Sequence, residues 1–192
     1  MNGWHAIVPL KQGAEAKSRL SSAMDSAGRT CLSTAMALHV LSVLANDDAI
    51  ASVTLLSPAR LPGWDGGWMV DPATGINAVL DNWLADNAVH NRLIVHADLP
   101  VLSDEDVQAL IASADGAGAA MAPDRAGTGT NALALRAGHM VQCRFGPDSC
   151  RLHLAQRPDM ALVRMPGLAF DVDTPADLEA LPARFRRTFA GS

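Results

Sequence analysis

The sequence predicts an α/β fold with a mostly parallel central sheet and helices on both of its faces. Short apolar runs typical of buried strands alternate along the chain with segments in which apolar residues recur at helical spacing. Two acidic clusters, at 96–100 and 171–175, each follow an apolar run and precede a helix start. Ligands of open parallel sheets bind beyond the carboxyl ends of the strands, so we expect both clusters at a functional site.

In the first half of the chain, three strands and two helices are expected. The apolar run at 6–10 is typical of a buried first strand, and Ser57-Pro58 ends the second. Apolar side chains recur through 31–45 at the spacing of one helix face. The expected strands cover 6–10, 53–56 and 68–70, and the expected helices cover 31–45 and 76–84.

The second half continues the alternation. Ser103 and Asp106 have the spacing of a helix cap, and Thr174 precedes a proline at the first position of the last helix. The runs that precede the acidic clusters, 93–97 and 168–170, have the character of strands. The other expected elements are extended segments at 117–122, 132–135 and 162–165 and a short helix at 148–155.

Length and composition fit one domain. The chain has 192 residues, and 49% of them are hydrophobic, which is ample for a core. We expect a single domain over residues 1–183, followed by a short basic tail at 184–192. The net charge of −5 gives no sign of a nucleic-acid partner.

Three observations favour a cytoplasmic protein. Cys31, Cys143 and Cys150 form no C-x-x-C pair and are expected to be free thiols in a reducing compartment. No apolar run approaches the roughly 18 residues of a membrane span, so no membrane partner is expected. The N-terminus lacks the layout of a signal peptide.

Asp98, Asp171 and Asp173 are the first candidate functional residues. Three carboxylates at strand ends are costly to bury or crowd unless a cation neutralises them. Mg²⁺ is the natural candidate, because it takes hard oxygen ligands and often uses one or two carboxylates plus phosphate oxygens. The acidic clusters therefore predict a magnesium site and chemistry on a phosphate.

The loop after the first strand carries three cations, Lys11, Lys17 and Arg19. Lys17-Ser18 suggests a P-loop, but that pattern needs a glycine immediately before the lysine, where this chain has Ala16. A triphosphate would sit at such a loop in an open α/β sheet. A solvated charged loop is the open alternative.

Two glycine-containing segments have the character of anion-binding loops. Thr128 and Thr130 lie in a Gly-Thr-Gly-Thr run, where backbone N–H groups can approach a ligand and hydroxyls add donors. Gly146 and Ser149 lie at the start of an expected helix, whose N-terminus favours anions. Taken singly, each segment is also compatible with an ordinary turn. His153, four residues after Ser149, is open between a ligand-binding residue and a packed histidine.

In this order, the motifs resemble those of the CofC/FbiD guanylyltransferases of coenzyme F-420 biosynthesis. The most specific pieces are Lys-Ser-Arg-Leu at 17–20, Gly-Thr-Asn at 129–131 and Asp-x-Asp-Thr at 171–174. Further matching pieces lie at 75–80, 97–100, 122–125 and 145–149. The resemblance runs from about residue 6 to residue 181, nearly the whole chain.

The resemblance implies a single-domain, three-layer Rossmann-like nucleotidyltransferase fold. It implies that GTP and a small phosphorylated carboxylic acid give a guanosine diphospho-linked product and pyrophosphate. The acceptors of this family are phosphoenolpyruvate, 3-phospho-D-glycerate and 2-phospho-L-lactate. The Gly-Thr-Gly-Thr form of the loop favours the first two acids over the third.

The resemblance and the loops together assign residue roles. Mg²⁺ and GTP are the expected small partners besides the acceptor acid, and Lys17 and Asp98 are expected to be catalytic. The expected ligands are, for Mg²⁺, Asp98, Asp171 and Asp173; for GTP, Lys11, Lys17, Arg19, Gly75 and Asn77; and for the acceptor, Thr128, Thr130, Gly146 and Ser149. We further expect hand-over of the product to the enzyme that transfers it to the deazaflavin, and a homodimer is an open expectation.

Two other functions stay open at this point. One is a different nucleotidyltransferase of the same fold, with a sugar-phosphate or molybdopterin acceptor. Such enzymes usually have a glycine-rich first loop, whereas this loop has the single Gly13. The other is a non-catalytic GTP-binding protein, which the presence of Lys17 and all three acidic residues disfavours.

Overall fold

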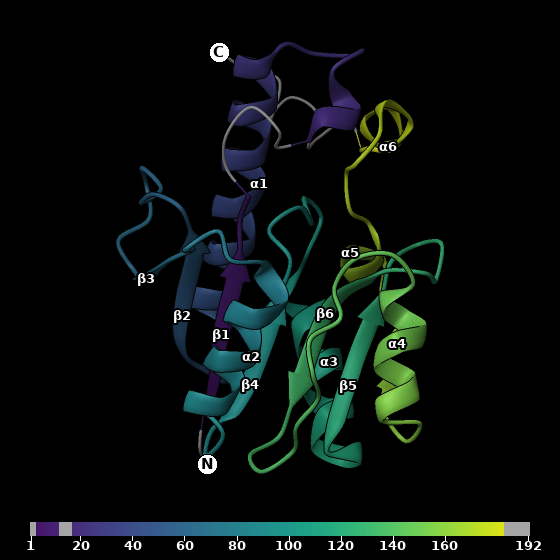
Figure 1. Ribbon diagram of the computed structural model, residues 1–192. Helices are drawn as coiled ribbons and strands as arrows, with labels where there is room; N and C mark the ends of the chain where they lie inside the picture. Colours follow the sequence, from purple (N-terminus) through teal and green to yellow (C-terminus); the bar gives the residue numbers. More distant parts are fainter. Residues whose placement is uncertain (1–2, 12–16, 183–192) are drawn as a thin grey trace.

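The computed structural model describes residues 3–11 and 17–182 and confirms the predicted fold class (Figure 1). Within these residues, seven strands form one sheet, accompanied by six α-helices and one 3₁₀ turn. The strands are β1 (Trp4–Pro9), β2 (Ile50–Ser57), β3 (Gly67–Val70), β4 (Asn91–Val95), β5 (Ala119–Pro123), β6 (Thr130–Leu135) and β7 (Ala161–Leu162). The helices are η1 (Ser18–Leu20), α1 (Ser26–Asn46), α2 (Ile76–Asp86), α3 (Asp104–Ala117), α4 (Ser149–Gln156), α5 (Pro166–Ala169) and α6 (Pro175–Ala180).

The order of the strands places a crevice beside β1. The sheet runs β3-β2-β1-β4-β6-β5-β7, and all neighbours are parallel except that β6 is antiparallel to both β4 and β5. The chain moves outward from β1 through β2 to β3 and then returns to the other side of β1 with β4. The strand order thus reverses between β1 and β4, and such switch points are where open α/β sheets bind ligands.

The helices cover both faces of the sheet, as predicted (Figure 1). Along β4, Leu93 and Val95 pack into the core on the side of α1 and α3, while Ile94 packs on the side of α2 and α4. This alternation follows from the two-residue period of a strand, and the run Leu93–Val95, which is buried on both faces of the sheet, is apolar throughout. Two layers of core therefore enclose the sheet.

Helix α1 is long and apolar enough, by length and composition, to cross a membrane, with a mean hydropathy of 1.2. Its buried side chains, among them Met36, Val40 and Leu44, pack into the core instead. A core helix on a parallel sheet is expected to be this apolar. The helix begins at Ser26, five residues before the predicted start, because Asp25 accepts a hydrogen bond from the Gly28 N–H as an N-cap.

The prediction of a strand at 168–170 is wrong. The structure forms the short helix α5 there, which begins at Pro166, and the acidic cluster that follows is therefore not at a strand end. Asp106 of α3 holds α5 in place by accepting a hydrogen bond from the Gly167 N–H at 3.0 Å. A Cβ at residue 167 would lie 2.1 Å from Asp106 Oδ2, so only glycine allows this approach. The strand predicted at 162–165 is also shorter than expected, because β7 covers only Ala161–Leu162.

Arg92 on β4 is a fully buried cation that ties together the end of the sheet opposite the crevice. Its guanidinium donates to the carbonyl oxygens of Leu84, His90, Arg136 and His139 at 2.5–3.1 Å. We expect Arg92→Met to lower the free energy of unfolding in urea by about 3 kcal/mol or more, because several buried carbonyls lose their donors. The control Arg151→Met, at a side chain that is 72% exposed, should change it by less than about 0.5 kcal/mol. Equal losses in the two variants would contradict this role.

Candidate active site

A cleft of about 930 Å³ opens at the carboxyl ends of β1 and β4. The sequence-predicted residues that line it come from both halves of the chain: Lys11, Lys17, Arg19, Gly75, Asp98, Thr128, Thr130, Gly146, Ser149, Asp171 and Asp173. The two acidic clusters meet although the second does not end a strand, because the Val172 N–H donates to the Asp98 carbonyl at 3.2 Å. The fold therefore gathers the predicted cations, carboxylates and hydroxyls in one place.

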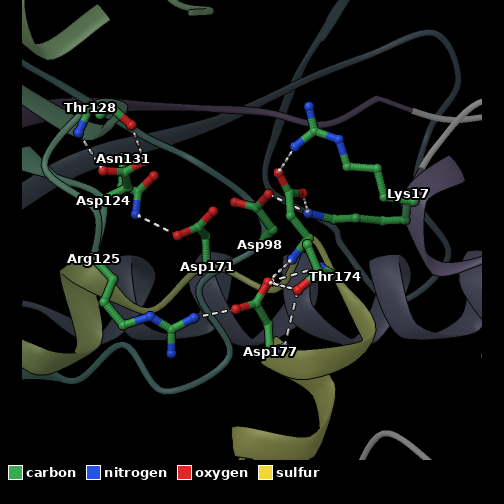
Figure 2. Close-up of polar contacts among 11 residues, drawn as sticks. Lys17, Asp98, Asp124, Arg125, Thr128, Asn131, Asp171, Thr174 and Asp177 are labelled. Carbon is green, nitrogen blue, oxygen red and sulfur yellow. Dashed lines mark hydrogen bonds and ion pairs between the residues drawn. The ribbon is translucent and has the colours of Figure 1, made fainter. Parts of the chain in front are cut away.

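Lys17 lies between two of the carboxylates (Figure 2). Its Nζ is 2.5 Å from Asp98 Oδ2 and 2.7 Å from Asp173 Oδ1, while Arg19 approaches Asp173 from the other side at 3.7 Å. Burial disfavours the charged amine, but the attraction of Asp98 and Asp173 outweighs it and raises the pKa of Lys17. Lys17 is thus a nearly buried cation. Its backbone has φ of 53°, a left-handed conformation that is uncommon for a residue other than glycine.

Asp98 is ionised, and one of its two carboxylate oxygens has no hydrogen-bond partner among the described residues. Burial alone would raise the pKa of its carboxyl, but the Lys17 ammonium outweighs burial and holds that pKa below its usual value. Asp98 Oδ1 is buried and makes no hydrogen bond within the part of the chain that the structure describes. A buried carboxylate oxygen without a partner is costly, so the site is built for a further positive group or donor.

Asp171 faces Asp98 from the second cluster (Figure 2). Burial, followed by repulsion from Asp98, raises the pKa of the Asp171 carboxyl to about 6. Asn131 on β6 holds the segment by donating from Nδ2 to the Leu168 carbonyl at 3.0 Å and to Asp171 Oδ1 at 3.3 Å. The protein therefore brings two carboxylates together at a cost that a cation would remove.

These residues fit a divalent cation with oxygen ligands from a substrate. The unpartnered Asp98 oxygen and the disfavoured charge on Asp171 are both features that a cation would relieve. Within residues 3–11 and 17–182, no three His, Cys, Asp or Glu side chains are close enough to hold a metal ion by themselves. Mg²⁺ commonly binds through one or two carboxylates, with phosphate oxygens completing its shell. Asp173 differs from the other two, because Lys17 and Arg19 already pair with it.

The threonine and glycine segments also line the cleft. Thr130 is buried at the start of β6, and its hydroxyl lies 3.1 Å from His153 Nδ1. Ser149 is buried at the first position of α4, and Gly146 has φ of 129°, which favours glycine. Thr128 is placed differently, because its N–H and its hydroxyl both donate to the Asp124 carboxylate.

Asn77 does not line the cleft, contrary to its expected contact with the nucleotide. Its Oδ1 accepts from the Phe145 N–H at 2.8 Å, and its Nδ2 donates to the Phe145 carbonyl at 3.0 Å. Both ends of the amide are therefore committed to the backbone. Asn77 fixes the start of the 145–149 segment against α2, which is a positioning role that the sequence did not reveal.

One lining residue has no signal in the sequence. Ser33 of α1 is only 8% exposed, and its hydroxyl has no hydrogen-bond partner in the described part of the chain. Its place in the cleft depends on how α1 crosses the end of β1, which a helical pattern alone does not give. Arg125, which follows the lining residue Asp124, ties this loop to α6 by donating to Asp177 at the start of that helix (Figure 2). Its guanidinium also stacks on Phe170.

Because Asp171 is buried close to Asp98, we expect its ionised carboxylate to lower the free energy of unfolding of the metal-free protein. We expect Asp171→Asn to raise the free energy of unfolding by about 1–2 kcal/mol at pH 7.5 in EDTA, because ionised Asp171 is disfavoured in the folded state. The gain should fade as the pH falls from about 6 towards 4, where the carboxyl of the unmodified protein becomes protonated. Urea unfolding across this pH range measures it, with the exposed Asp86→Asn as the control. Destabilisation by Asp171→Asn would contradict the prediction.

Comparison with known proteins gives both sequence and structural relatives. The family model described as "Guanylyl transferase CofC like" matches residues 4–182. The phosphoenolpyruvate guanylyltransferase of Sphaerobacter thermophilus is 37% identical and aligns over 92% of this chain and 91% of its own length. The enzyme of the same name from Nocardia farcinica is 36% identical over 91% of this chain and 83% of its own length.

The structural relatives agree on the fold. A protein of Desulfovibrio desulfuricans G20, provisionally described as a nucleotide-diphospho-sugar transferase, superposes with a TM-score of 0.79 at 18% identity, covering 99% of this chain and 94% of that one. A 4-diphosphocytidyl-2C-methyl-D-erythritol synthase gives 0.63 at 16% identity, covering 100% and 99%. At such identities the likeness establishes the architecture alone.

Proposed function

Because the chain belongs to the CofC-like guanylyltransferase family and is therefore a nucleotidyltransferase, we propose that it transfers GMP from GTP to phosphoenolpyruvate and releases pyrophosphate. The observation that carries this proposal is a cleft lined both by the Lys17–Asp98 pair and by Thr130 and Ser149. A nucleotide triphosphate and a small anionic acceptor need these two kinds of surface, cationic and hydrogen-bond donating, next to each other.

In the proposed reaction, an oxygen of the acceptor's phosphate attacks the α-phosphorus of GTP in line. The bond from the α-phosphorus to the bridging oxygen of the β-phosphate breaks, and pyrophosphate leaves with that electron pair. The attacking oxygen is already an anion, so no general base is required. Catalysis then consists of positioning and charge neutralisation, which the cleft supplies.

Lys17 is the residue that we assign to the triphosphate. As a nearly buried cation at the switch point, it is held by Asp98 and Asp173 where negative charge builds up on the leaving pyrophosphate. Arg19 and Lys11 line the same end of the cleft and extend the positive surface. Gly75, which has φ of 104° and no atom within 4 Å of a Cβ position, gives a nucleotide room beside α2.

Asp98 and Asp171 are the carboxylates that would hold Mg²⁺, with Asp173 as a third ligand if Lys17 moves to the nucleotide. When bound there, Mg²⁺ would neutralise phosphate charge and act as a Lewis acid on the α-phosphate. Asp98 offers its unpartnered Oδ1, and Asn131 orients Asp171. Asp173 keeps Lys17 and Arg19 together in the substrate-free protein.

The acceptor would bind against Thr130, Gly146 and Ser149. Thr130 and Ser149 line the cleft and are nearly fully buried. Their burial favours a small, enclosed acceptor over a larger one such as a sugar phosphate. Thr128, whose hydroxyl is engaged by Asp124, supports the shape of this loop. We rank phosphoenolpyruvate first because the two relatives named above carry that acid in their names, and 3-phospho-D-glycerate and 2-phospho-L-lactate after it.

A role in coenzyme F-420 biosynthesis is part of the proposal. The proposed product is a diphosphate in which the phosphate of GMP is linked to the phosphate of the acid. Such an activated diphosphate needs a second enzyme that uses it as a donor. Hand-over to the enzyme that transfers it to a deazaflavin, a homodimeric assembly and a cytoplasmic location complete the proposal.

The experiment that tests this function measures pyrophosphate release with Mg²⁺. GTP, CTP and UTP are each offered with phosphoenolpyruvate, 3-phospho-D-glycerate, 2-phospho-L-lactate or glucose 1-phosphate, and pyrophosphatase pulls the reaction forward. We expect release only with GTP and a phosphorylated carboxylic acid, with phosphoenolpyruvate fastest. Release with the sugar phosphate, or GTP binding without release in any mixture, would contradict the proposal and favour one of the two alternatives.

A further inference from the structure

We propose that His153 is a positioning residue that makes the Thr130 hydroxyl a hydrogen-bond donor towards the acceptor substrate. The inference rests on the proposed function, in which Thr130 binds the acceptor acid, and it assigns a role to a histidine that does not itself line the cleft. It follows from the hydrogen bonds at the two nitrogens of the imidazole ring.

The Arg144 backbone determines where the ring proton is. The Arg144 N–H donates to His153 Nε2 at 3.0 Å, and a backbone N–H can only donate. Nε2 must therefore be unprotonated, and the proton of the neutral imidazole must be on Nδ1. His153 is 0% exposed, and burial, followed by the neighbouring His96, lowers the pKa of its ring to about 4, which keeps the ring neutral at physiological pH.

The hydroxyl of Thr130 must then accept. His153 Nδ1 lies 3.1 Å from Thr130 Oγ1, and with the proton on Nδ1 the ring donates to that oxygen. A threonine hydroxyl has one proton of its own and rotates to suit its surroundings. Since the histidine occupies one acceptor position of Oγ1, the hydroxyl proton turns away from the ring. Thr130 lines the cleft, and His153 does not, so the proposal directs this proton into the cleft.

The arrangement matches the chemistry of the acceptor. Carboxylate and phosphate oxygens only accept hydrogen bonds, so a hydroxyl whose proton is directed into the cleft is complementary to them. Phe145 keeps the ring in place, because its own ring packs edge-on against His153 at 5.2 Å between centroids. From its sequence position, His153 is compatible with either a ligand-binding or a packed residue; the geometry makes it a packed residue that acts on the ligand through Thr130.

Two variants test the inference through the acceptor's KM. His153→Leu removes the donor, whereas His153→Asn places an amide N–H near the position of Nδ1. For phosphoenolpyruvate, we expect the KM to rise by about tenfold or more in His153→Leu and to recover most of the way in His153→Asn, since one hydrogen bond to a charged ligand corresponds to about that factor. The KM for GTP should stay within about twofold in both variants.

The Thr130→Val background separates positioning from packing. If His153 acts through the hydroxyl, His153→Leu should add nothing further to the KM for phosphoenolpyruvate once that hydroxyl is gone. Equal effects of His153→Leu with and without Thr130→Val, or equal rises in both substrates' KM values, would overturn the inference.

A spectroscopic measurement keeps the inference testable should a variant fold poorly. In ¹⁵N-labelled unmodified protein, His153 should show the neutral Nδ1–H form across pH 6–8. The Nε2–H form or a charged ring would overturn the inference, whatever the enzyme's activity. Absence of turnover by the unmodified enzyme would instead count against the proposed function, so the two failures are distinguishable.

Discussion

Replacing Asp98 with asparagine should lower kcat for guanylyl transfer by at least about 10³-fold, which corresponds to about 4 kcal/mol of the barrier. The reason is that Asp98 serves two partners at once: one oxygen binds Lys17, and the buried Oδ1 is left for a cation. Asparagine preserves the shape but removes the charge that both partners need. Initial rates of pyrophosphate release at saturating GTP and Mg²⁺ measure the loss.

The fold should survive this change. Asp98 lies at the end of the cleft, and the link to the second acidic cluster uses its backbone carbonyl rather than its side chain. The midpoint of thermal unfolding should therefore stay within a few degrees of the unmodified protein. The matched control is Asp159→Asn, an exposed carboxylate paired with Arg157, which should leave kcat unchanged. A variant Asp98→Asn that keeps near-normal turnover with Mg²⁺ would contradict the assignment of the metal site.

Replacing Lys17 with methionine should reduce kcat by about 10²–10³-fold, the scale reported for a single preorganised electrostatic group. The Lys17 side chain is nearly buried, at 11% exposure, whereas the Arg19 side chain is 75% exposed. Charge in a site from which water is excluded contributes more than charge in solvent. Arg19→Met should therefore act mainly through the KM for GTP, by roughly tenfold or less.

The comparison of these two variants is informative in itself. Similar losses in kcat for Lys17→Met and Arg19→Met would mean that burial of the cation does not matter. A loss confined to the KM for GTP in Lys17→Met would mean that Lys17 binds the ground state and the transition state equally well. Either result would contradict the role assigned to Lys17 in stabilising the departing pyrophosphate.

The sequence predicted the fold, and every candidate site residue except Asn77 lines the cleft, because both depend on local patterns. Apolar runs such as 93–97 and caps such as Ser103 with Asp106 are specified within a few residues. The cap is confirmed, and the strand forms two residues earlier than predicted, at Asn91–Val95. Once the strands alternate with helices, loops that follow the strands beside the switch point must meet at one edge. The convergence of Lys17 and Asp98 could therefore be predicted from their positions alone.

The rest depends on contacts between distant segments. The run 168–170 is apolar enough for a strand, but Gly167 packs against Asp106, more than sixty residues earlier, and a helix forms instead. Asn77 looked like a nucleotide ligand because it follows the third strand, yet both ends of its amide bind Phe145. Contacts of this kind join residues that lie far apart in the sequence at no fixed spacing. The periodicity of apolar residues therefore does not predict them.

The measurement that tests the central claim most directly is the ³¹P NMR spectrum of the protein incubated with GTP, phosphoenolpyruvate, Mg²⁺ and pyrophosphatase. If the cleft joins GMP to the acceptor's phosphate, the phosphomonoester signal of phosphoenolpyruvate and the γ-phosphate signal of GTP should disappear together. Two mutually coupled signals of an unsymmetrical diphosphate, distinct from those of GDP, should appear in their place, and Asp98→Asn should abolish these changes. Conversion of GTP to GMP without a coupled pair, or unchanged GTP alongside intact phosphoenolpyruvate, would contradict guanylyl transfer to this acid.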